Sequence, residues 1–326
     1  MPDHAPLVVC AGEVLVDFIA QERGTDVGSA RTFIKSQGGA VANVAVGLAR
    51  LGARSRFVGK VGADPFGRFL KRCLSGEGVD LRWLIESGYP TGLVFVILDE
   101  ARVPRFCFFG DPSADMMLSD EEVSPETVSG ACFLHVGTVS MVGEVSRKAS
   151  FKLIELAAAS KVKLSFDPNL RLHLWKDHEL LKRLALEVIS SAALVKVNEE
   201  ELVFLTGLSS ISKGAARLQE QGAEVVVVTR GPAGAYFLCP QGEGEAKGFP
   251  VPVEDTTGAG DGFVAGLLLS LAENGSWPPS LPLMHQAVEF ANAVGALVTT
   301  KVGAVSALPS RDQVEKFLSQ QKNKCS

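Results

Sequence analysis

The chain has 326 residues, of which 46% are hydrophobic and 21% charged, and its formal net charge is −5 at pH 7. This length and composition are typical of a globular protein with a large buried core. The acidic balance argues against a surface that binds nucleic acid or an anionic membrane.

Neither a targeting segment nor a cysteine-based site is evident in the sequence. The N-terminal residues lack the basic and then apolar pattern of a signal peptide, and no apolar run approaches the roughly 20 residues that span a bilayer. The six cysteines are scattered, with no CxxC pair and no Cys/His cluster, so zinc and iron–sulfur sites are disfavoured. We therefore expect a cytoplasmic protein with reduced thiols and no membrane or nucleic-acid partner.

The first part of the chain alternates between strand and helix patterns. The predicted elements are strands over residues 7–11 and 13–20, a helix over 40–51, a strand over 56–62 and a helix over 66–75. The first strand is continuously apolar, as a buried parallel strand is, and the second alternates as a half-exposed strand does. The first helix lies between Gly38-Gly39 and Gly52, with its apolar residues on one face. The second helix has Pro65 in its first turn.

Residues 91–109 break this alternation. Apolar runs over 93–98 and 105–109, joined by a turn at 99–102, predict a β-hairpin. Together with residues 13–20 and residues near 31–36, the hairpin would form a small second sheet. In a chain of alternating strands and helices, we expect such a sheet to act as a lid or as a dimer contact.

After Gly110 the alternation of strands and helices resumes. Strands are predicted over 131–136, 162–166, 194–197 and 225–229, and helices over 144–160, 178–191, 199–205 and 212–221. Two further helices, over about 258–272 and 282–299, precede a polar tail after Leu308. This order predicts a mostly parallel, doubly wound sheet flanked by helices.

Polar residues directly follow several of the predicted strands. They are Gly137-Thr138, Asp167-Pro168-Asn169, Asn198 and Thr229-Arg230-Gly231. In doubly wound sheets, ligands bind beyond the carboxyl ends of the strands. We therefore expect these residues to line one site at that edge.

The most informative stretch is Asp255-Thr256-Thr257-Gly258-Ala259-Gly260-Asp261, which precedes an apolar helical run. Its three small residues would let backbone N–H groups converge on an anion at a helix N-terminus. Asp261 would compete with that anion unless its task is to take a proton from the attacking group. A plain capped helix start explains the same residues, and the local stretch leaves the two interpretations equal.

Several common catalytic signatures are missing from the sequence. No stretch fits GxxxxGK[ST], GxSxG or HExxH, and no GxGxxG follows a strand. A Walker-type ATPase and a conventional dinucleotide enzyme are therefore disfavoured.

Two separated motifs resemble those of the PfkB (ribokinase-like) carbohydrate kinases. The first is Gly38-Gly39-Ala40-Val41-Ala42-Asn43-Val44-Ala45, with Gly52 and Gly62 at the family's spacing. The second is the 255–261 motif, continued by Ala265-Gly266-Leu267. Asn198-Glu199-Glu200-Glu201 and Val228-Thr229-Arg230-Gly231, between them, look like the family's N-x-x-E element and its nucleotide-side strand end. The resemblance covers essentially the whole chain.

The resemblance implies one kinase domain over residues 1–326 with the ribokinase-like fold. Its α/β core would comprise about 1–12, 38–90 and 111–320, and its β-sheet lid about 13–37 and 91–110. Within the family, residues 39–52, 112–118 and 166–175 are most similar to fructokinase segments. Gly110-Asp111 stands where an Arg-Asn pair is common and His173 where proline is common, so the sugar is less determined than the reaction.

The matching positions imply the roles of individual residues. Asp261 would be the general base that deprotonates the attacking sugar hydroxyl, and the amides of Gly258, Ala259 and Gly260 would stabilise the transferring phosphoryl group. The expected sugar-binding residues are Asp17, Gly38, Gly39, Asn43, Arg105 and Arg171. The expected ATP-binding residues are Asn198, Thr229, Gly231, Gly258, Gly260 and Asn292.

The resemblance also implies two metal ions. Glu201 would act on Mg²⁺ through water, because Mg²⁺ gives up its hydration reluctantly. Backbone carbonyls of Asp255 and Thr257 would hold K⁺ beside the anion site. Without the resemblance, Glu201 would be explained by the helix dipole, Asp17 as an edge-strand charge and Asn43 as a helix-surface amide.

The sequence thus predicts an ATP-dependent kinase that converts D-fructose to fructose 6-phosphate, with a homodimer formed through the lid sheets. One alternative is a 2-keto-3-deoxygluconate kinase, whose acidic substrate would suit Arg105 and Arg171. A second alternative is a catalytically silent relative that only binds sugar or nucleotide. The intact 258–261 motif argues against the second alternative.

Overall fold

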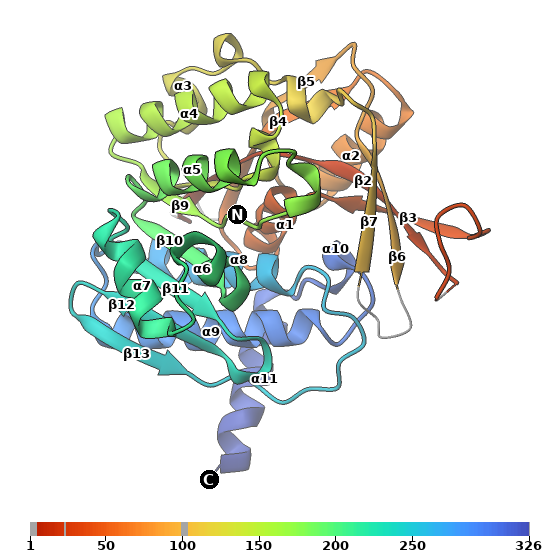
Figure 1. The fold of residues 1–326 in the computed structure, drawn as a ribbon. Coiled ribbons are helices and arrows are strands. Elements are labelled where there is room, and N and C mark those ends of the chain that lie inside the picture. Colours follow the sequence, from red (N-terminus) through yellow and green to blue (C-terminus); the bar gives the residue numbers. More distant parts are fainter. Residues whose placement is uncertain (1–4, 23, 99–103, 326) are drawn as a thin grey trace.

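The computed structural model describes residues 5–22, 24–98 and 104–325, and these residues form two sheets (Figure 1). The larger sheet runs, in spatial order, through β13 (Gly242–Ala246), β12 (Ala235–Cys239), β11 (Val225–Thr229), β10 (Leu194–Asn198), β9 (Lys163–Phe166), β8 (Phe133–Val136), β1 (Leu7–Ala11), β4 (Arg54–Gly62) and β5 (Asp80–Ser87). The smaller sheet has the order β3 (Phe33–Gly38), β2 (Leu15–Ala20), β6 (Leu93–Leu98) and β7 (Pro104–Phe109).

The larger sheet is mostly parallel, as predicted. Neighbouring strands from β5 to β11 all pair in parallel, and only β12 and β13 pair antiparallel at one edge of the described sheet. Strand β1 shows why both faces of the larger sheet must be covered by helices. Val8 and Cys10 contribute to one apolar core, Val9 and Ala11 to another, and all four are buried.

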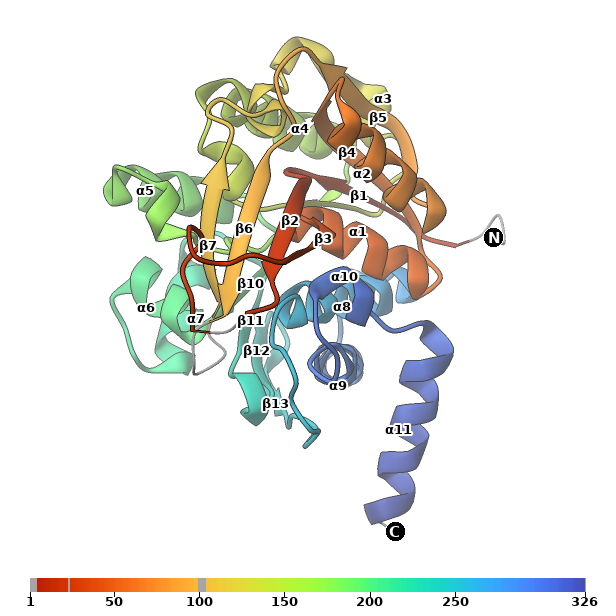
Figure 2. The same cartoon turned by 90° about the vertical axis from the view of Figure 1, so that its right-hand side faces the viewer.

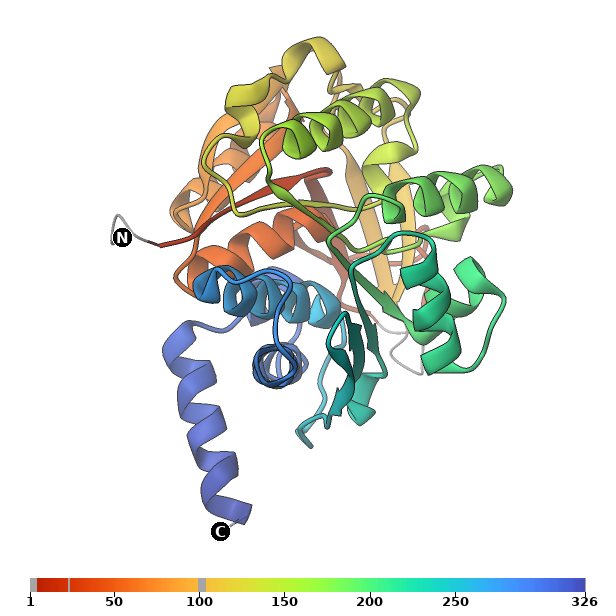
Figure 3. The ribbon, with the colours of Figure 1, turned by 90° about the vertical axis from the view of Figure 1, so that its left-hand side faces the viewer.

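Helices cover both faces of the larger sheet (Figure 3). The first core contains side chains of α1 (Ala40–Arg50), α2 (Pro65–Gly76), α8 (Ala259–Asn274), α9 (Leu281–Val298), α10 (Ala304–Ala307) and α11 (Arg311–Cys325). The second contains side chains of α3 (Pro125–Val128), α4 (Glu144–Ala159), α5 (His178–Ile189), α6 (Glu199–Thr206) and α7 (Ile211–Glu220). Among the described helices, none is long and apolar enough to cross a membrane.

The predicted hairpin is confirmed, because β6 and β7 pair antiparallel and join β2 and β3 in the smaller sheet. Its predicted turn, residues 99–102, lies outside the described residues. Figure 2 shows β7, β6, β2 and β3 side by side on the face turned to the viewer, and Figure 1 shows that they lie at one side of the molecule.

The prediction of a polar tail after Leu308 is wrong, since residues 311–325 form α11. Val314 of this helix is fully buried, and Phe317 and Leu318 pack against the same core. These three residues have the i, i+3, i+4 spacing of an amphipathic helix, within an otherwise polar segment. Strands β5, β12 and β13 were also not predicted. The sequence of β13, Gly-Glu-Gly-Glu-Ala, has no apolar side chain larger than alanine to mark it as a strand.

Asp64 connects the start of α2 to the segment that leads into the smaller sheet. Its Oδ1 accepts hydrogen bonds from the N–H groups of Phe66 and Gly67, at 2.9 and 2.8 Å, as a helix N-cap does. The same carboxylate accepts hydrogen bonds from the N–H and the hydroxyl of Thr91, at 2.8 and 2.9 Å. Thr91 is buried and precedes β6 by two residues.

We expect Asp64→Ala to lower the free energy of unfolding by about 2–3 kcal/mol, because it removes a cap and leaves buried groups of Thr91 unpaired. Asp177→Ala is the matched control, since Asp177 caps α5 through a single hydrogen bond to the Leu180 N–H. This control should lose only about 1 kcal/mol. Urea denaturation at pH 7 measures both losses, and equal losses would contradict the bridging role of Asp64.

Candidate functional site

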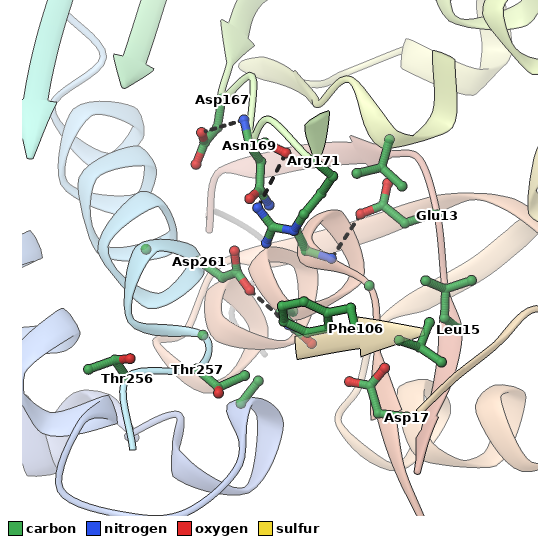
Figure 4. Close-up of a pocket in the computed structure, with 18 of the residues that line it drawn as sticks. Glu13, Leu15, Asp17, Phe106, Asp167, Asn169, Arg171, Thr256, Thr257 and Asp261 are labelled. Carbon is green, nitrogen blue, oxygen red and sulfur yellow. Dashed lines mark hydrogen bonds between the residues drawn. The ribbon is translucent and has the colours of Figure 1, made fainter. Parts of the chain in front are cut away.

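A cavity of about 660 Å³ lies where the carboxyl ends of β9 and β10, the N-terminus of α8 and the inner face of the smaller sheet meet (Figure 4). Of the predicted site residues, Asp17, Gly39, Asn43, Arg171, Asn198, Glu201, Thr257, Gly258, Gly260 and Asp261 line it. Residues far apart in the sequence thus meet at the expected edge of the larger sheet.

The N-terminus of α8 has the geometry of an anion site. Gly258 is its N-cap residue with φ of 79°, and no side chain caps the helix. A Cβ at Gly258 would lie 2.7 Å from the Cβ of Ala304, so only glycine fits. The N–H of Ala259 donates to the Thr256 carbonyl at 3.2 Å. No acceptor among the described residues takes the N–H groups of Gly258 and Gly260, which are free for an anion.

Asp261 lies in the first turn of α8 with its carboxylate in the cavity. Burial raises its pKa to about 6, and the charge of Asp167 adds to this effect. Asn43 opposes the shift, since its Nδ2 donates a hydrogen bond of 2.8 Å to Asp261 Oδ2. A carboxyl group with a pKa near neutrality suits a general base, because it is ionised at pH 7 and still binds a proton appreciably.

Asp17 faces the same cavity from β2. Gly38 provides the space for it, because a Cβ at Gly38 would lie 2.2 Å from an Asp17 carboxylate oxygen. Burial and the charge of Asp261 raise the pKa of Asp17 to about 7. Gly38 therefore supports Asp17 rather than lining the cavity itself.

Two cations face these carboxylates. Lys196 is buried in β10, and its Nζ forms an ion pair of 3.0 Å with Asp167 Oδ2. Burial alone would lower the pKa of Lys196, but the charges of Asp167, Glu201 and Asp261 outweigh it and raise this pKa. A Cβ at Gly260 would lie only 3.4 Å from Lys196 Nζ, which places this ammonium beside the anion site.

Arg171 follows β9 and holds its guanidinium over the Phe106 ring, 5.7 Å from the ring centre. His173, two residues further on, lies beside Phe108, with the centroids of the two rings 5.6 Å apart. Phe106 and Phe108 belong to β7, so the smaller sheet contacts the loop that leaves the larger one. Arg105 points the other way, because residues alternate along a strand, and its exposed side chain does not line the cavity.

Glu201 is buried and engaged on both oxygens. Its Oε1 accepts a hydrogen bond from the Leu170 N–H at 2.9 Å, and its Oε2 accepts one from the Asn198 N–H at 2.8 Å. Asn198 returns the contact by accepting from the Glu201 N–H at 2.8 Å. Burial raises the pKa of Glu201. This hydrogen bonding suits a carboxylate that acts on a metal ion through water rather than by direct ligation.

A second cavity of about 300 Å³ adjoins the first, and Thr256 and Gly260 line both. Its wall is mainly apolar and also includes Thr229, Gly231 and Asn292, all predicted to bind ATP. Asn292 donates from Nδ2 to the carbonyls of Ala246 and Lys247, at 3.0 and 3.2 Å. A mainly apolar cavity next to an anion site has the character of a pocket for a nucleotide base.

Asp255 joins two loops behind the anion site. Its Oδ1 accepts hydrogen bonds from the N–H and hydroxyl of Thr257, at 2.9 and 2.7 Å. Its Oδ2 accepts one from the Gly303 N–H at 2.8 Å. These contacts fix the backbone of both loops, as a cation site built from backbone carbonyls requires.

Asp167 lines the cavity, as predicted for a polar residue that follows a strand. Two charged lining residues, Lys196 and Glu13, were not predicted, although Lys196 was visible as a lysine inside the apolar run of β10. Glu13 had no such signal. It is 1% exposed, and its Oε1 accepts the Ala40 N–H at 2.9 Å, so it caps α1 in place of a side chain at Gly39.

The fold and the site define a ribokinase-like carbohydrate kinase. Residues 5–311 match the pfkB family carbohydrate kinases, and the chain belongs to this family. It is 38% identical to fructokinase-1 of Oryza sativa subsp. japonica over 98% of this chain and 99% of that protein. It is 39% identical to the probable fructokinase-7 of Arabidopsis thaliana over 97% of this chain and 94% of that protein.

Solved structures show the same relationship. A fructokinase from Vibrio cholerae O395, with fructose, ADP and potassium ion bound, has a TM-score of 0.87 and 37% identity, covering 98% of this chain and 100% of that one. Aminoimidazole riboside kinase from Salmonella enterica, complexed with aminoimidazole riboside and an ATP analogue, has a TM-score of 0.84 and 29% identity, covering 96% and 99%. The predicted family and ribokinase-like fold are confirmed, and the protein is a phosphotransferase with an alcohol acceptor.

Substitution of Asn43 tests whether Asp261 acts as the general base. Its hydrogen bond stabilises the charged form of Asp261, so Asn43→Ala should raise the pKa of Asp261 above its present value of about 6. The acidic limb of kcat/KM against pH would then move to higher pH, because the base stays protonated longer. A pH profile of sugar-dependent ADP release measures this shift. A lower plateau with an unmoved limb would contradict the assignment of that limb to Asp261.

Proposed function

We propose that this protein is an ATP-dependent fructokinase that transfers the γ-phosphoryl group of ATP to D-fructose and releases fructose 6-phosphate. Its similarity to fructokinases over nearly the whole chain supports this proposal. The observation that carries it is the position of Asp261. This carboxylate lies in the first turn of α8, within the larger cavity, and Gly260 beside it lines both cavities.

In the proposed reaction, Asp261 takes the proton of the C6 hydroxyl of fructose. The hydroxyl oxygen forms a bond to the γ-phosphorus while the bond from that phosphorus to the β–γ bridging oxygen breaks, and ADP leaves. The free N–H groups of Gly258 and Gly260, together with the ammonium of Lys196, would stabilise the negative charge of the transferring group. The N–H of Ala259 would contribute less, because it already donates to Thr256.

The sugar would occupy the part of the larger cavity next to the smaller sheet. Asp17 would accept hydrogen bonds from its hydroxyls, and Gly39 would allow its close approach. Asn43 would connect sugar and base, since its Nδ2 holds Asp261 while its Oδ1 has no hydrogen-bond partner among the described residues. Arg171 and Phe106 would form the opposite wall.

The charge of the cavity wall favours fructose over 2-keto-3-deoxygluconate in this proposal. A carboxylate substrate needs more than one unoccupied cation, because Asp17 and Asp261 already supply negative charge. Arg171 is available, but Lys196 is paired with Asp167, and Arg105 does not line the cavity. Carboxylate and amide acceptors instead suit the hydroxyl groups of a neutral sugar.

ATP would place its base in the second cavity, beside Gly231 and Asn292, and its phosphates along Thr229, Asn198 and Gly260. Mg²⁺ would enter with the phosphates and neutralise part of their charge. The oxygen ligands near Glu201, Asn198 and Asp167 are of the kind that this hard cation prefers. K⁺ would be held by backbone carbonyls of Asp255 and Thr257, in the loop that the Asp255 side chain fixes.

The smaller sheet would act as the lid of a single kinase domain. Its inner face presents Asp17, Val94 and Phe106 to the cavity, and closure would exclude water from the phosphoryl group. Its outer face carries stacked aromatic rings, with centroids 5.2 Å apart for Phe18 and Phe95, and Phe109 is 50% exposed. Two copies would pair through these lids. The cytoplasmic location stays a prediction from the sequence.

A substrate panel tests the function. In coupled assays of ADP release, we expect fructose to be phosphorylated with a kcat/KM at least about 10²-fold above those of 2-keto-3-deoxygluconate, ribose and adenosine, because a substrate that leaves buried polar groups of the site unpaired is strongly disfavoured. If 2-keto-3-deoxygluconate is phosphorylated and fructose is not, the proposed substrate is wrong and the keto-acid takes its place. Sugar and nucleotide binding without any ADP release would favour a silent relative.

Asp261→Asn tests the mechanism. We expect it to lower kcat by roughly 10²-fold to 10⁴-fold, the usual range for a lost general base, while sugar binding persists. The control is Asp120→Asn, an exposed aspartate that lines neither cavity, which should leave kcat unchanged. If the Asp261→Asn variant has the kcat of the wild type, Asp261 is not the general base.

A further inference from the structure

The wall of the second cavity includes a loop without regular structure. After β13 the chain runs through residues 247–258 to α8 without forming a helix or a strand. Gly248, Phe249, Pro250, Val251 and Val253 of this loop all line the cavity. Since a loop of this kind has few backbone hydrogen bonds to fix it, its position depends on side-chain contacts with its neighbours.

Helix α11 supplies an aromatic contact to this loop. The rings of Phe249 and Phe317 meet edge to face, with centroids 5.3 Å apart and an interplanar angle of 72°. This arrangement is a favourable one for two aromatic rings. Phe249 therefore has the cavity on one side and α11 on another.

The helix is itself anchored to the catalytic part of the protein. Val314 is fully buried in the core that α8 and α9 share. Arg311 binds Glu273, near the C-terminal end of α8, through two hydrogen bonds of 2.5 and 3.3 Å. Beyond these contacts α11 extends away from the body of the molecule (Figure 2). Its first two turns thus connect the far end of α8 to the loop of the second cavity.

We propose that α11 sets the affinity of the protein for its nucleotide, with Phe317 as a positioning residue that holds Phe249 against the base. This inference rests on the proposed function, in which the second cavity takes the base of ATP. Phe317 is not in that cavity and acts only through Phe249. Helix α11, which the sequence suggested was a polar tail, would in this proposal help to shape the nucleotide-binding site.

Phe317→Ala tests the proposal. The variant should raise the KM for ATP and the Kd for ADP about twofold to tenfold, the range that corresponds to the loss of one aromatic pair. The KM for fructose and kcat should stay within experimental error, because the larger cavity and Asp261 do not touch Phe317. Phe317→Leu, which keeps an apolar side chain of similar reach, should recover part of the affinity.

Lys316→Ala is the matched control, since Lys316 is the neighbouring residue of the same helix and is exposed. This substitution should change neither the KM for ATP nor the Kd for ADP. Thermal denaturation of each variant shows whether the fold persists. If Phe317→Ala does not fold, Phe317→Leu and a double-mutant cycle with Phe249→Leu carry the test.

The cycle separates a positioning role from a structural one. If Phe317 acts through Phe249, replacing it in a protein that already carries Phe249→Leu should have little further effect on ADP binding. Additive effects, or a lower melting temperature with an unchanged Kd for ADP, would overturn the proposal. Calorimetric binding of ADP needs no turnover, so this result is independent of whether fructose is the substrate.

Discussion

The site depends on the burial of several carboxylates beside one helix N-terminus. Asp17, Asp167 and Asp261 line one cavity, and only Lys196 and Arg171 among the described lining residues bring formal positive charge to it. Burial raises the pKa values of Asp261 and Asp17 to about 6 and about 7, and the like charges of Asp167 and Asp261 add to this effect. The burial that makes the site costly to assemble therefore also gives Asp261 a proton affinity suited to a base.

This arrangement has a consequence for stability. The two raised pKa values exceed the ordinary value of 3.8 that applies to an unfolded chain. Between about pH 4 and pH 7 the folded protein then binds more protons than the unfolded protein, so these groups favour folding at low pH and oppose it as the pH rises. The rest of the fold must offset this effect at neutral pH. The buried valines of strands such as β1 and β11 supply part of that stability through their apolar contacts.

Much of the fold and part of the site could be predicted from the sequence. Apolar runs located the parallel strands other than β5, helical periodicity located most of the helices between them, and the polar residues after the strands marked the correct edge of the sheet. The pairing of side chains could not be predicted. Asn43 and Asp261 are 218 positions apart, and Lys196 meets Asp167 only because β9 and β10 are neighbours. Helix α11 was not predicted, because three apolar residues among many polar ones give only a weak helical pattern, although one of them is fully buried.

Strand register decides which chemistry the sugar would meet. In β7, Phe106 and Phe108 face the cavity while Arg105 faces out, and a shift of one residue would reverse this order. The sequence places a cation and an aromatic ring side by side, so it allows either an acidic or a neutral substrate. The structure puts the ring inside, beneath the guanidinium of Arg171, which is then the one cation left for the sugar among the described lining residues once Lys196 is paired with Asp167. The proposed preference for a neutral sugar thus rests on the pairing of β6 with β7 rather than on residue composition.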